Sequence, residues 1–163
     1  MHISKLFCTF APDLERMTKT ETYQSILSQI ESLVAGETDI IANMANVAAV
    51  LHEVFGFWWT GFYRVERTHE LVLGPFQGPI ACTRIPFGKG VRGTAWQRAE
   101  TVIVPNVHEF AGHIACSSAS NSEIVVPILR DGQVIAVLDI DSTEYNAFDT
   151  VDKEYLEQIA KVL

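Results

Sequence analysis

This chain has few cysteines, few basic residues and no long apolar run. Three cysteines in 163 residues, unevenly spaced, do not make a disulfide framework. The 20 Asp and Glu residues outnumber the 12 Lys and Arg residues, which gives a net charge of −8 and argues against a nucleic-acid-binding surface. No apolar run approaches the ~20 residues of a membrane helix, and the N-terminus carries no secretory signal pattern. We therefore expect a cytoplasmic protein with reduced thiols that binds neither nucleic acid nor membrane.

The composition is that of one ordinary domain. The chain is 48% hydrophobic and has no internal repeat, low-complexity tract or linker. A chain of this length buries about 70% of the surface that it exposes when unfolded. Residues 1–19 have no regular pattern and are predicted to form an N-terminal arm, in which Cys8 is a spectator. Residues 20–163 are predicted to form a single domain.

Three segments have the apolar spacing of amphipathic helices. The first runs from a cap at Thr20 or Thr22 to about residue 34, and the second spans 39–55 and stops at Gly56. The third closes the chain, over 149–163. All three present one apolar face, so each is expected to pack on a common partner layer.

Between these helices the pattern changes to short strands, and Asp131-Gly132 is a strong hairpin signal. The expected strands are 57–66, 70–76, 101–104, 124–129 and 134–140. Two helices, hairpin-linked strands and a closing helix predict an α+β fold, with an antiparallel sheet covered by helices. The glycine-rich run 88–93 lacks the spacing of a phosphate loop and is predicted to be a mobile loop or lid.

Cys116 is the first candidate for chemistry. Six of the seven residues from 117 to 123 are polar, and partial exposure with a stabilised thiolate is what a reactive cysteine needs. His113 and loop N–H groups could supply that stabilisation, while a buried, inert thiol is the alternative. Cys82 is either a resolving thiol or a bystander. A zinc site formed by His108, His113 and Cys116, with Cys82 as a possible fourth ligand, is a weaker hypothesis, because no Cys-x-x-Cys pair is present.

Acidic residues are the second candidates. Asp139 and Asp141 end an apolar strand, and their spacing puts both on one face. Adjacent like charges raise at least one pKa, which leaves a carboxyl able to donate a proton, although solvated strand ends carry such acids too. A two-residue turn would put Glu123 opposite Ile140 and away from both aspartates. A three-residue loop or a bulge at Pro127 would instead bring it to Asp141.

An aromatic run, residues 58–63, precedes these acids. Alternation places Trp59, Gly61 and Tyr63 on one face of a strand. Core packing is the ordinary explanation of such a stripe. The alternative is a pocket wall for a methyl thioether or a cation.

Taken together, the motifs resemble those of free methionine-(R)-sulfoxide reductases, a catalytic branch of the GAF domains. The matching segments are Trp59-Thr60-Gly61-Phe62-Tyr63, Phe76-Gln77-Gly78-Pro79, Ala81-Cys82-Thr83-Arg84-Ile85-Pro86, Gly88-Lys89-Gly90-Val91, His113-Ile114-Ala115-Cys116, Ser122-Glu123-Ile124-Val125-Val126-Pro127 and Leu138-Asp139-Ile140-Asp141-Ser142. The likeness covers about residue 20 to the end. It implies a GAF-like six-stranded antiparallel sheet with helices packed on it, often in a homodimer.

The resemblance also implies a reaction. Cys116 becomes the catalytic thiol that attacks the sulfoxide sulfur, and Cys82 resolves the resulting sulfenic acid as a disulfide for thioredoxin to reduce. Asp141 or Glu123 protonates the sulfoxide oxygen. The residues implied to bind the substrate are Trp59, Tyr63, Glu123, Asp139 and Asp141. Free methionine-(R)-sulfoxide is the expected substrate, without a metal or an organic cofactor.

One position departs from the family pattern. Many members carry a third cysteine in the sequence Gly-Val-Cys-Gly, and this chain has Arg92 there. A disulfide through that position is excluded, whereas a Cys82–Cys116 couple is not. Two other classes stay open on sequence grounds: a non-catalytic GAF sensor of a small ligand, and a thiol-based peroxide sensor.

Overall fold

The structure, a computed structural model, describes residues 17–66, 69–114 and 118–163. The helices are α1 (Lys19–Val34), α2 (Ile40–Phe55), α3 (Gly90–Arg98) and α4 (Thr150–Lys161), with a short 3-10 turn, η3 (Val107–Glu109). The strands are β1 (Trp59–Glu66), β2 (Glu70–Gln77), β3 (Arg84–Pro86), β4 (Val102–Val104), β5 (Ser122–Arg130) and β6 (Gln133–Ser142). Within these ranges no helix has the length and apolarity needed to cross a bilayer. The proposed N-terminal arm and Cys116 fall largely or wholly outside the described residues and stay predictions.

All six strands form one antiparallel sheet in the order β3-β2-β1-β6-β5-β4. The central strands β1 and β6 come from opposite ends of the sheet-forming segment, and they bring the aromatic run beside the two aspartates. This architecture confirms the predicted α+β class with a six-stranded antiparallel sheet.

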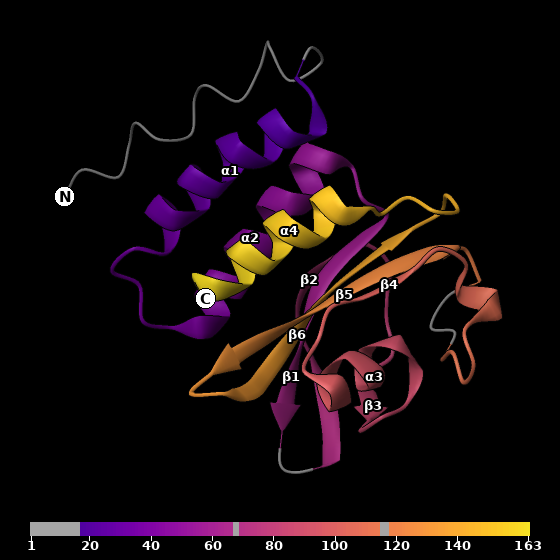
Figure 1. Ribbon diagram of the computed structural model, residues 1–163. Coiled ribbons are helices and arrows are strands. Elements are labelled where there is room, and N and C mark those ends of the chain that lie inside the picture. Colours follow the sequence, from indigo (N-terminus) through magenta and orange to yellow (C-terminus); the bar gives the residue numbers. More distant parts are fainter. Residues whose placement is uncertain (1–16, 67–68, 115–117) are drawn as a thin grey trace.

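Two layers cover the sheet on opposite sides (Figure 1). Helices α1, α2 and α4 pack together on one face, where the larger apolar cluster includes Phe62, Ile124 and Leu138. Helix α3 and the loops around it lie over the other face, with a second cluster that includes Tyr63 and Val125. Because side chains alternate along a strand, Glu123 shares the face of Val125 rather than that of Ile124. The acids therefore lie on the α3 side of the sheet.

The ends of helices α1 and α2 can be compared with the caps predicted from the sequence. Asp39 caps α2 by accepting hydrogen bonds from two backbone N–H groups, and Gly56 ends it with a left-handed φ of 64°. Thr18 caps α1 in a capping box with Glu21. The predicted cap at Thr20 or Thr22 was wrong, because the hydroxyl that accepts from the third helical N–H belongs to Thr18, two and four residues earlier.

The prediction of a mobile loop or lid over residues 88–93 was also wrong for most of that run, which begins helix α3. Glycines at 90 and 93 have low helix propensity and no side-chain cap precedes the helix, so its local sequence favours a loop. Packing outweighs that preference, since Val91 and Ala95 are buried in the second cluster. A Cβ at Gly93 would lie 2.6 Å from the carbonyl oxygen of Pro86, so glycine lets the helix approach that strand.

The β5–β6 hairpin contains the irregularity that the sequence left open. Its turn has two residues, with Arg130 paired to Gln133, but the register shifts between Ile128 and Leu129. From there to the strand ends the pairing is offset by one, and Glu123 lies opposite Asp141. The expected alternatives, a three-residue loop or a bulge at Pro127, predicted the observed pairing of Glu123 with Asp141. They misplaced the irregularity, which lies between Ile128 and Leu129.

Candidate functional site

Three buried carboxyl groups form the centre of the site. Glu123 on β5 is 2% exposed, and Asp139 and Asp141 on β6 are 0% and 4% exposed. Asp139 is paired with Val125 and Asp141 with Glu123, so the three side chains occupy adjacent positions on the α3 face. The face of Glu123, which the sequence left open, is thus that of the two aspartates, as the family resemblance implied.

A buried cation from α3 lies among these acids. Arg92, 6% exposed, binds Asp139 Oδ2 through Nε. The same Nε lies 3.6 Å from Glu123 Oε1, and one terminal nitrogen lies 3.5 Å from Asp141 Oδ2. Burial lowers the pKa of Arg92, but the three acids outweigh it and raise that pKa well above its ordinary value. Arg92 therefore stays charged and compensates part of the buried negative charge.

The acids around it are poised to hold protons. Burial, followed by the charge of Asp139, raises the pKa of Glu123 well above its ordinary range. The same two causes raise the pKa of Asp141 to about 7, against the opposing effects of Arg92 and Ser120. Ser120 donates a 2.6 Å hydrogen bond from Oγ to Asp141 Oδ1. A carboxyl with a pKa near 7 can donate and recover a proton at neutral pH.

Aromatic rings form the wall next to the acids. The Trp59 and Tyr63 ring centroids are 6.0 Å apart, and Phe76 stacks on Trp59 at 5.4 Å. Trp59 donates from Nε1 to the carbonyl of Pro79 at 3.0 Å, which fixes the indole. A Cβ at Gly61 would lie 2.6 Å from the Trp59 ring, so the indole lies over this position. The sequence prediction that Trp59 and Tyr63 share a face is confirmed.

Cys82 adjoins the aromatic wall. Its carbonyl accepts a 2.9 Å hydrogen bond from the Tyr63 hydroxyl, and its sulfur is disulfide-bonded. The two other cysteines, Cys8 and Cys116, lie outside the described residues. The geometry therefore places Cys82 beside the aromatic wall, while the pairing of Cys82 with Cys116 stays a prediction.

His113 is the remaining ionisable group at the site. Its Nε2 lies 3.9 Å from Glu123 Oε2. Burial and then the charge of Arg92 lower its pKa, so His113 is neutral at pH 7. It can still donate or accept a hydrogen bond, but it does not supply the positive charge that would stabilise a nearby thiolate.

Two small cavities flank the acid cluster. One, of about 20 Å³, is lined by Trp58, Trp59, Ile80, Ala81, His113, Ser120 and Asp141. The other is smaller and is lined by Ile85, Gly90, Val91, Arg92, His113, Ile114 and Glu123. The first has room for about one water molecule. Asp141 thus borders the cavity with room for a water molecule, Glu123 borders the smaller one, and His113 lines both.

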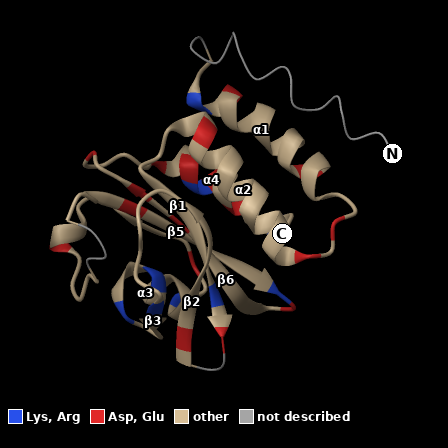
Figure 2. Cartoon of the chain, turned by 180° about the vertical axis from the view of Figure 1, so that it is seen from behind, with Lys and Arg blue, Asp and Glu red and all other residues tan. Residues whose placement is uncertain are grey.

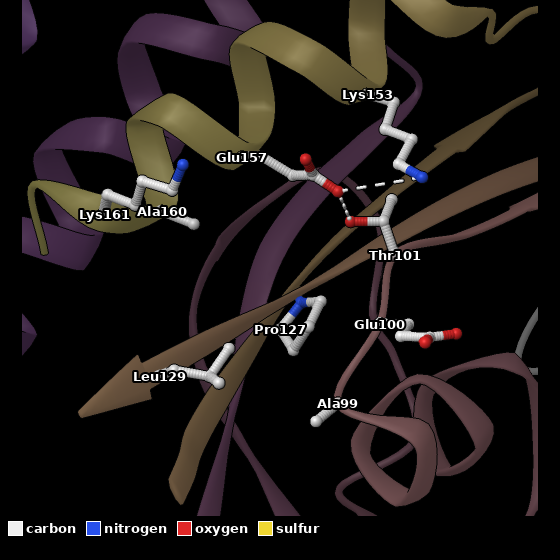
Figure 3. A pocket seen from close by; sticks show the side chains of 9 residues that line it. All are labelled: Ala99, Glu100, Thr101, Pro127, Leu129, Lys153, Glu157, Ala160 and Lys161. Carbon is white, nitrogen blue, oxygen red and sulfur yellow. Dashed lines mark hydrogen bonds and ion pairs between the residues drawn. The ribbon is translucent and has the colours of Figure 1, made fainter. Parts of the chain in front are cut away.

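A larger cavity lies elsewhere, at the sheet edge between the end of α3 and α4 (Figure 3). It measures about 560 Å³ and is lined by Ala99, Glu100, Thr101, Pro127, Leu129, Lys153, Glu157, Ala160 and Lys161. Glu157 accepts a 2.6 Å hydrogen bond from Thr101 and lies 4.0 Å from Lys153, so part of its polar lining is internally paired. Titratable side chains line this cavity but no aromatic side chain does, so it lacks the combination found at the acid cluster.

No set of three His, Cys, Asp or Glu side chains in the described parts of the chain could hold a metal ion. The zinc hypothesis included Cys116, which is outside those parts. Figure 2 shows acidic residues on both the helical layer and the strands, with basic residues on α3. Of the basic residues on α3, Arg92 contacts the acids of β5 and β6.

Two site residues were not predicted as functional. Arg92 was noted only as a departure from the family pattern, and Ser120 only as part of a polar loop. No signal in the sequence pointed to Arg92, because its burial became evident only when residues 90–98 were found to form a packed helix. No local signal pairs Ser120 with Asp141, because their contact joins residues 21 positions apart.

The fold and this face define an α+β domain that encloses an acidic, aromatic-walled site against its central strands. The GAF domain family model matches residues 19–163, and the chain belongs to that family. Within the family it is closely related to free methionine-R-sulfoxide reductases.

Three relatives illustrate that relation. The protein named free methionine-R-sulfoxide reductase of Escherichia coli is 49% identical over 148 residues, 90% of this chain and 89% of its own length. GAF domain-containing protein A of Dictyostelium discoideum is 57% identical and covers 94% of this chain and 98% of itself. The X-ray structure of the Neisseria meningitidis reductase in complex with its substrate superposes with a TM-score of 0.88 at 56% identity, over 90% of this chain and 88% of that one.

Proposed function

We propose that this protein reduces free methionine-(R)-sulfoxide to methionine. The observation that carries the proposal is the buried cluster of Glu123, Asp139 and Asp141 directly beside the Trp59–Tyr63 wall. Close relatives of similar length that bear the reductase name support the same activity. A site that couples proton donors to an apolar wall suits a polar S=O group attached to a methyl thioether.

In this mechanism the rings of Trp59 and Tyr63 hold the methyl-sulfoxide end of the substrate. Aromatic faces make favourable contacts with a methyl group and with sulfur. Trp59 is paired with Asp141 across β1 and β6, so a sulfur atom on the indole has its oxygen within reach of an acid. Asp141 and Glu123, which border the two cavities, are the acids that protonate that oxygen.

Cys116 is the proposed nucleophile. Its thiolate attacks the sulfoxide sulfur, the S–O bond breaks with a proton from Asp141 or Glu123, and the oxygen is transferred to the cysteine. Thiol and sulfoxide thereby give sulfenic acid and thioether, with the thiol oxidised by two electrons and the sulfoxide reduced by two. The proton released by the thiol restores the acid, so the step is balanced.

Cys82 is the proposed resolving cysteine. Its thiol condenses with the sulfenic acid, which releases water and forms a disulfide. Thioredoxin, a dithiol protein, then reduces that disulfide by thiol–disulfide exchange and is itself oxidised. This cycle requires no metal and no organic cofactor. The hydrogen bond from Tyr63 to the Cys82 carbonyl positions the backbone of the resolving residue.

The proposal extends to the setting of the enzyme. We place the activity in a single domain, residues 20–163, preceded by an N-terminal arm, in a cytoplasmic protein that assembles as a homodimer. Gel filtration with light scattering tests the last point, with twice the 163-residue chain mass as the expected result.

The proposed function is tested by comparing free with peptide-bound sulfoxide as substrates and by replacing each of the two cysteines. Free methionine-(R)-sulfoxide should be reduced far faster than the same sulfoxide within a peptide, because the free amino acid's own charges are bound. Replacement of Cys116 by Ser should abolish methionine formation with any reductant. Replacement of Cys82 by Ser should leave one equivalent of methionine per protein before the first reduction. Equal turnover of peptide-bound sulfoxide, or activity that survives Cys116→Ser, would overturn the proposal.

A further inference from the structure

Arg92 does not contact the three acids equally. Its Nε binds Asp139 directly, whereas Glu123 Oε1 and Asp141 Oδ2 lie 3.6 and 3.5 Å from its nitrogens. The contact with Asp141 is therefore a long hydrogen bond, and Glu123 lies just beyond hydrogen-bond distance of the guanidinium. The geometry divides the cluster into one firm ion pair and two looser acids.

Aromatic rings hold the guanidinium in this position. Its central carbon lies 5.0 Å from the centroid of Tyr63 and 6.0 Å from that of Trp59. A planar guanidinium over aromatic faces gains cation–π attraction and loses rotational freedom. Arg92 also comes from the first turn of α3, which Val91 and Ala95 anchor in the core. The cation is thus fixed with respect to both the sheet and the aromatic wall.

The division between the acids matches the cavities that they line. Among the described residues, Asp141 lines one of the two small cavities and Glu123 lines the other. Asp139 lines neither cavity and is fully buried. It lies two residues before Asp141 on β6, opposite Val125. The acid that Arg92 binds most closely is therefore the one that borders neither of these cavities.

Electrostatics point the same way. Three buried carboxylates around one cation cannot all be ionised at low cost, so the cluster retains protons near neutral pH. Arg92 lowers the pKa values of Glu123 and Asp141, and Asp139 raises both. The other ionisable groups facing them are Tyr63 on β1 and His113 in the loop before β5. Neither carries charge at neutral pH, because burial raises the pKa of Tyr63 and lowers that of His113.

We propose that Arg92 is a positioning residue for sulfoxide reduction, whose guanidinium binds Asp139 and so leaves Glu123 and Asp141 as the acids that deliver the proton. This inference rests on the proposed function, because it assigns a role within that reaction. The proton passes from Glu123 or Asp141 to the substrate oxygen as the S–O bond breaks, and the attacking thiol replaces it. Arg92 itself neither gains nor loses a proton.

The test compares Arg92→Met, which removes the charge, with Arg92→Lys, which keeps it. In Arg92→Met the pKa values of Glu123 and Asp141 rise, so the alkaline limb of the kcat profile should move to higher pH. kcat at pH 7 should fall about tenfold, as expected for a weakened proton donor, with KM nearly unchanged. Arg92→Lys should return the limb toward its wild-type position. A matched control is Arg84→Met, which removes an exposed, ion-paired arginine from β3 and should move nothing.

Two results would overturn the assignment. One is an Arg92→Met enzyme whose kcat at pH 7 and whose alkaline limb in the kcat profile are those of the wild type. The other is an equal loss of kcat in the Met and Lys variants with no movement of the limb, which is the outcome of a purely structural role. If Arg92→Met does not fold, Arg92→Gln, which also removes the charge, takes its place in the same comparison with Arg92→Lys.

A second readout separates this inference from the proposed function. Carbon-13 NMR of labelled Glu and Asp carboxyls follows the titration of the cluster without any turnover. The resonances of Glu123 and Asp141 should titrate at higher pH in Arg92→Met than in the wild type and Arg84→Met. Unchanged titration would overturn the role of Arg92 even in an active enzyme. A wild type that reduces no sulfoxide would instead overturn the proposed function, whatever the titration shows.

Discussion

Glu123 lies directly opposite Asp141 on neighbouring strands, one register position away from where a regular two-residue hairpin would place it. The shift between Ile128 and Leu129 turns the Glu123 side chain from the helical face of the sheet to the face of α3. A single irregularity some five residues distant thus completes the acid cluster.

Asp141→Asn tests the proposed proton donor. An amide has no acidic proton, so kcat should fall by about 10²–10⁴. In the wild type, Asp141 must be protonated to act, and its pKa is raised to about 7, so kcat should decline as the pH rises through that value. A kcat profile from pH 5 to 9 measures both effects. Glu144→Gln, the same kind of change at an exposed position just beyond β6, is the control and should keep the wild-type profile.

Ser120→Ala removes a hydrogen bond that lowers the pKa of Asp141. The pKa of Asp141 should therefore rise, and the alkaline limb of kcat should move to higher pH. The fold should be retained, since the loss of one hydrogen bond costs about 1 kcal/mol. A limb that stays in place or moves to lower pH would show that Asp141 is not the group observed in the profile.

Gly61→Ala should disturb the aromatic wall. The added Cβ would lie 2.3 Å from Phe76 Cβ and 2.6 Å from the Trp59 ring, so one of these rings must move. We expect a loss of about 1–3 kcal/mol in the free energy of unfolding and a shifted tryptophan fluorescence spectrum. Gly132→Ala offers a comparison, because nothing lies within 4 Å of its Cβ and only its positive φ opposes the change. Equal stability of the wild type and Gly61→Ala would contradict the packing described here.

Asp152→Ala tests the helical layer independently of the site. Asp152 is buried, accepts a 2.9 Å hydrogen bond from the Tyr23 hydroxyl and binds Lys19 at 2.7 Å, so it joins α4 to α1. Its removal leaves the buried hydroxyl without its partner and should cost about 3 kcal/mol in unfolding free energy. kcat should not change, because the sheet separates Asp152 from the acids. Glu154→Ala, at an exposed position of the same helix, should leave urea denaturation unchanged.

The predictable parts of this fold are those with local causes. The apolar period and the glycine after residue 55 located α2, and the Asp131-Gly132 turn located the β5–β6 hairpin. The spacing of Asp139 and Asp141 was enough to place both on one face. In each case the residues that carry the signal lie within a few positions of the structure that they specify.

The rest depends on contacts that no local pattern records. Helix α3 forms against the low helix propensity of Gly90 and Gly93, because burial of Val91 and Ala95 outweighs it. The sequence does not reveal where the β5–β6 register shifts either, because the residues on both sides of the shift, Ile128 and Leu129, are apolar. The Arg92–Asp139 pair joins positions 47 apart and could be recognised only when α3 was seen to pack on β6.

The most direct test of the account is NADPH oxidation coupled to thioredoxin and its reductase, with the separated R and S epimers of free methionine sulfoxide. The account predicts turnover of the R epimer alone, and its complete loss in Cys116→Ser. Absence of turnover with both epimers, with active thioredoxin and again with dithiothreitol, would contradict it and favour a ligand-binding GAF domain.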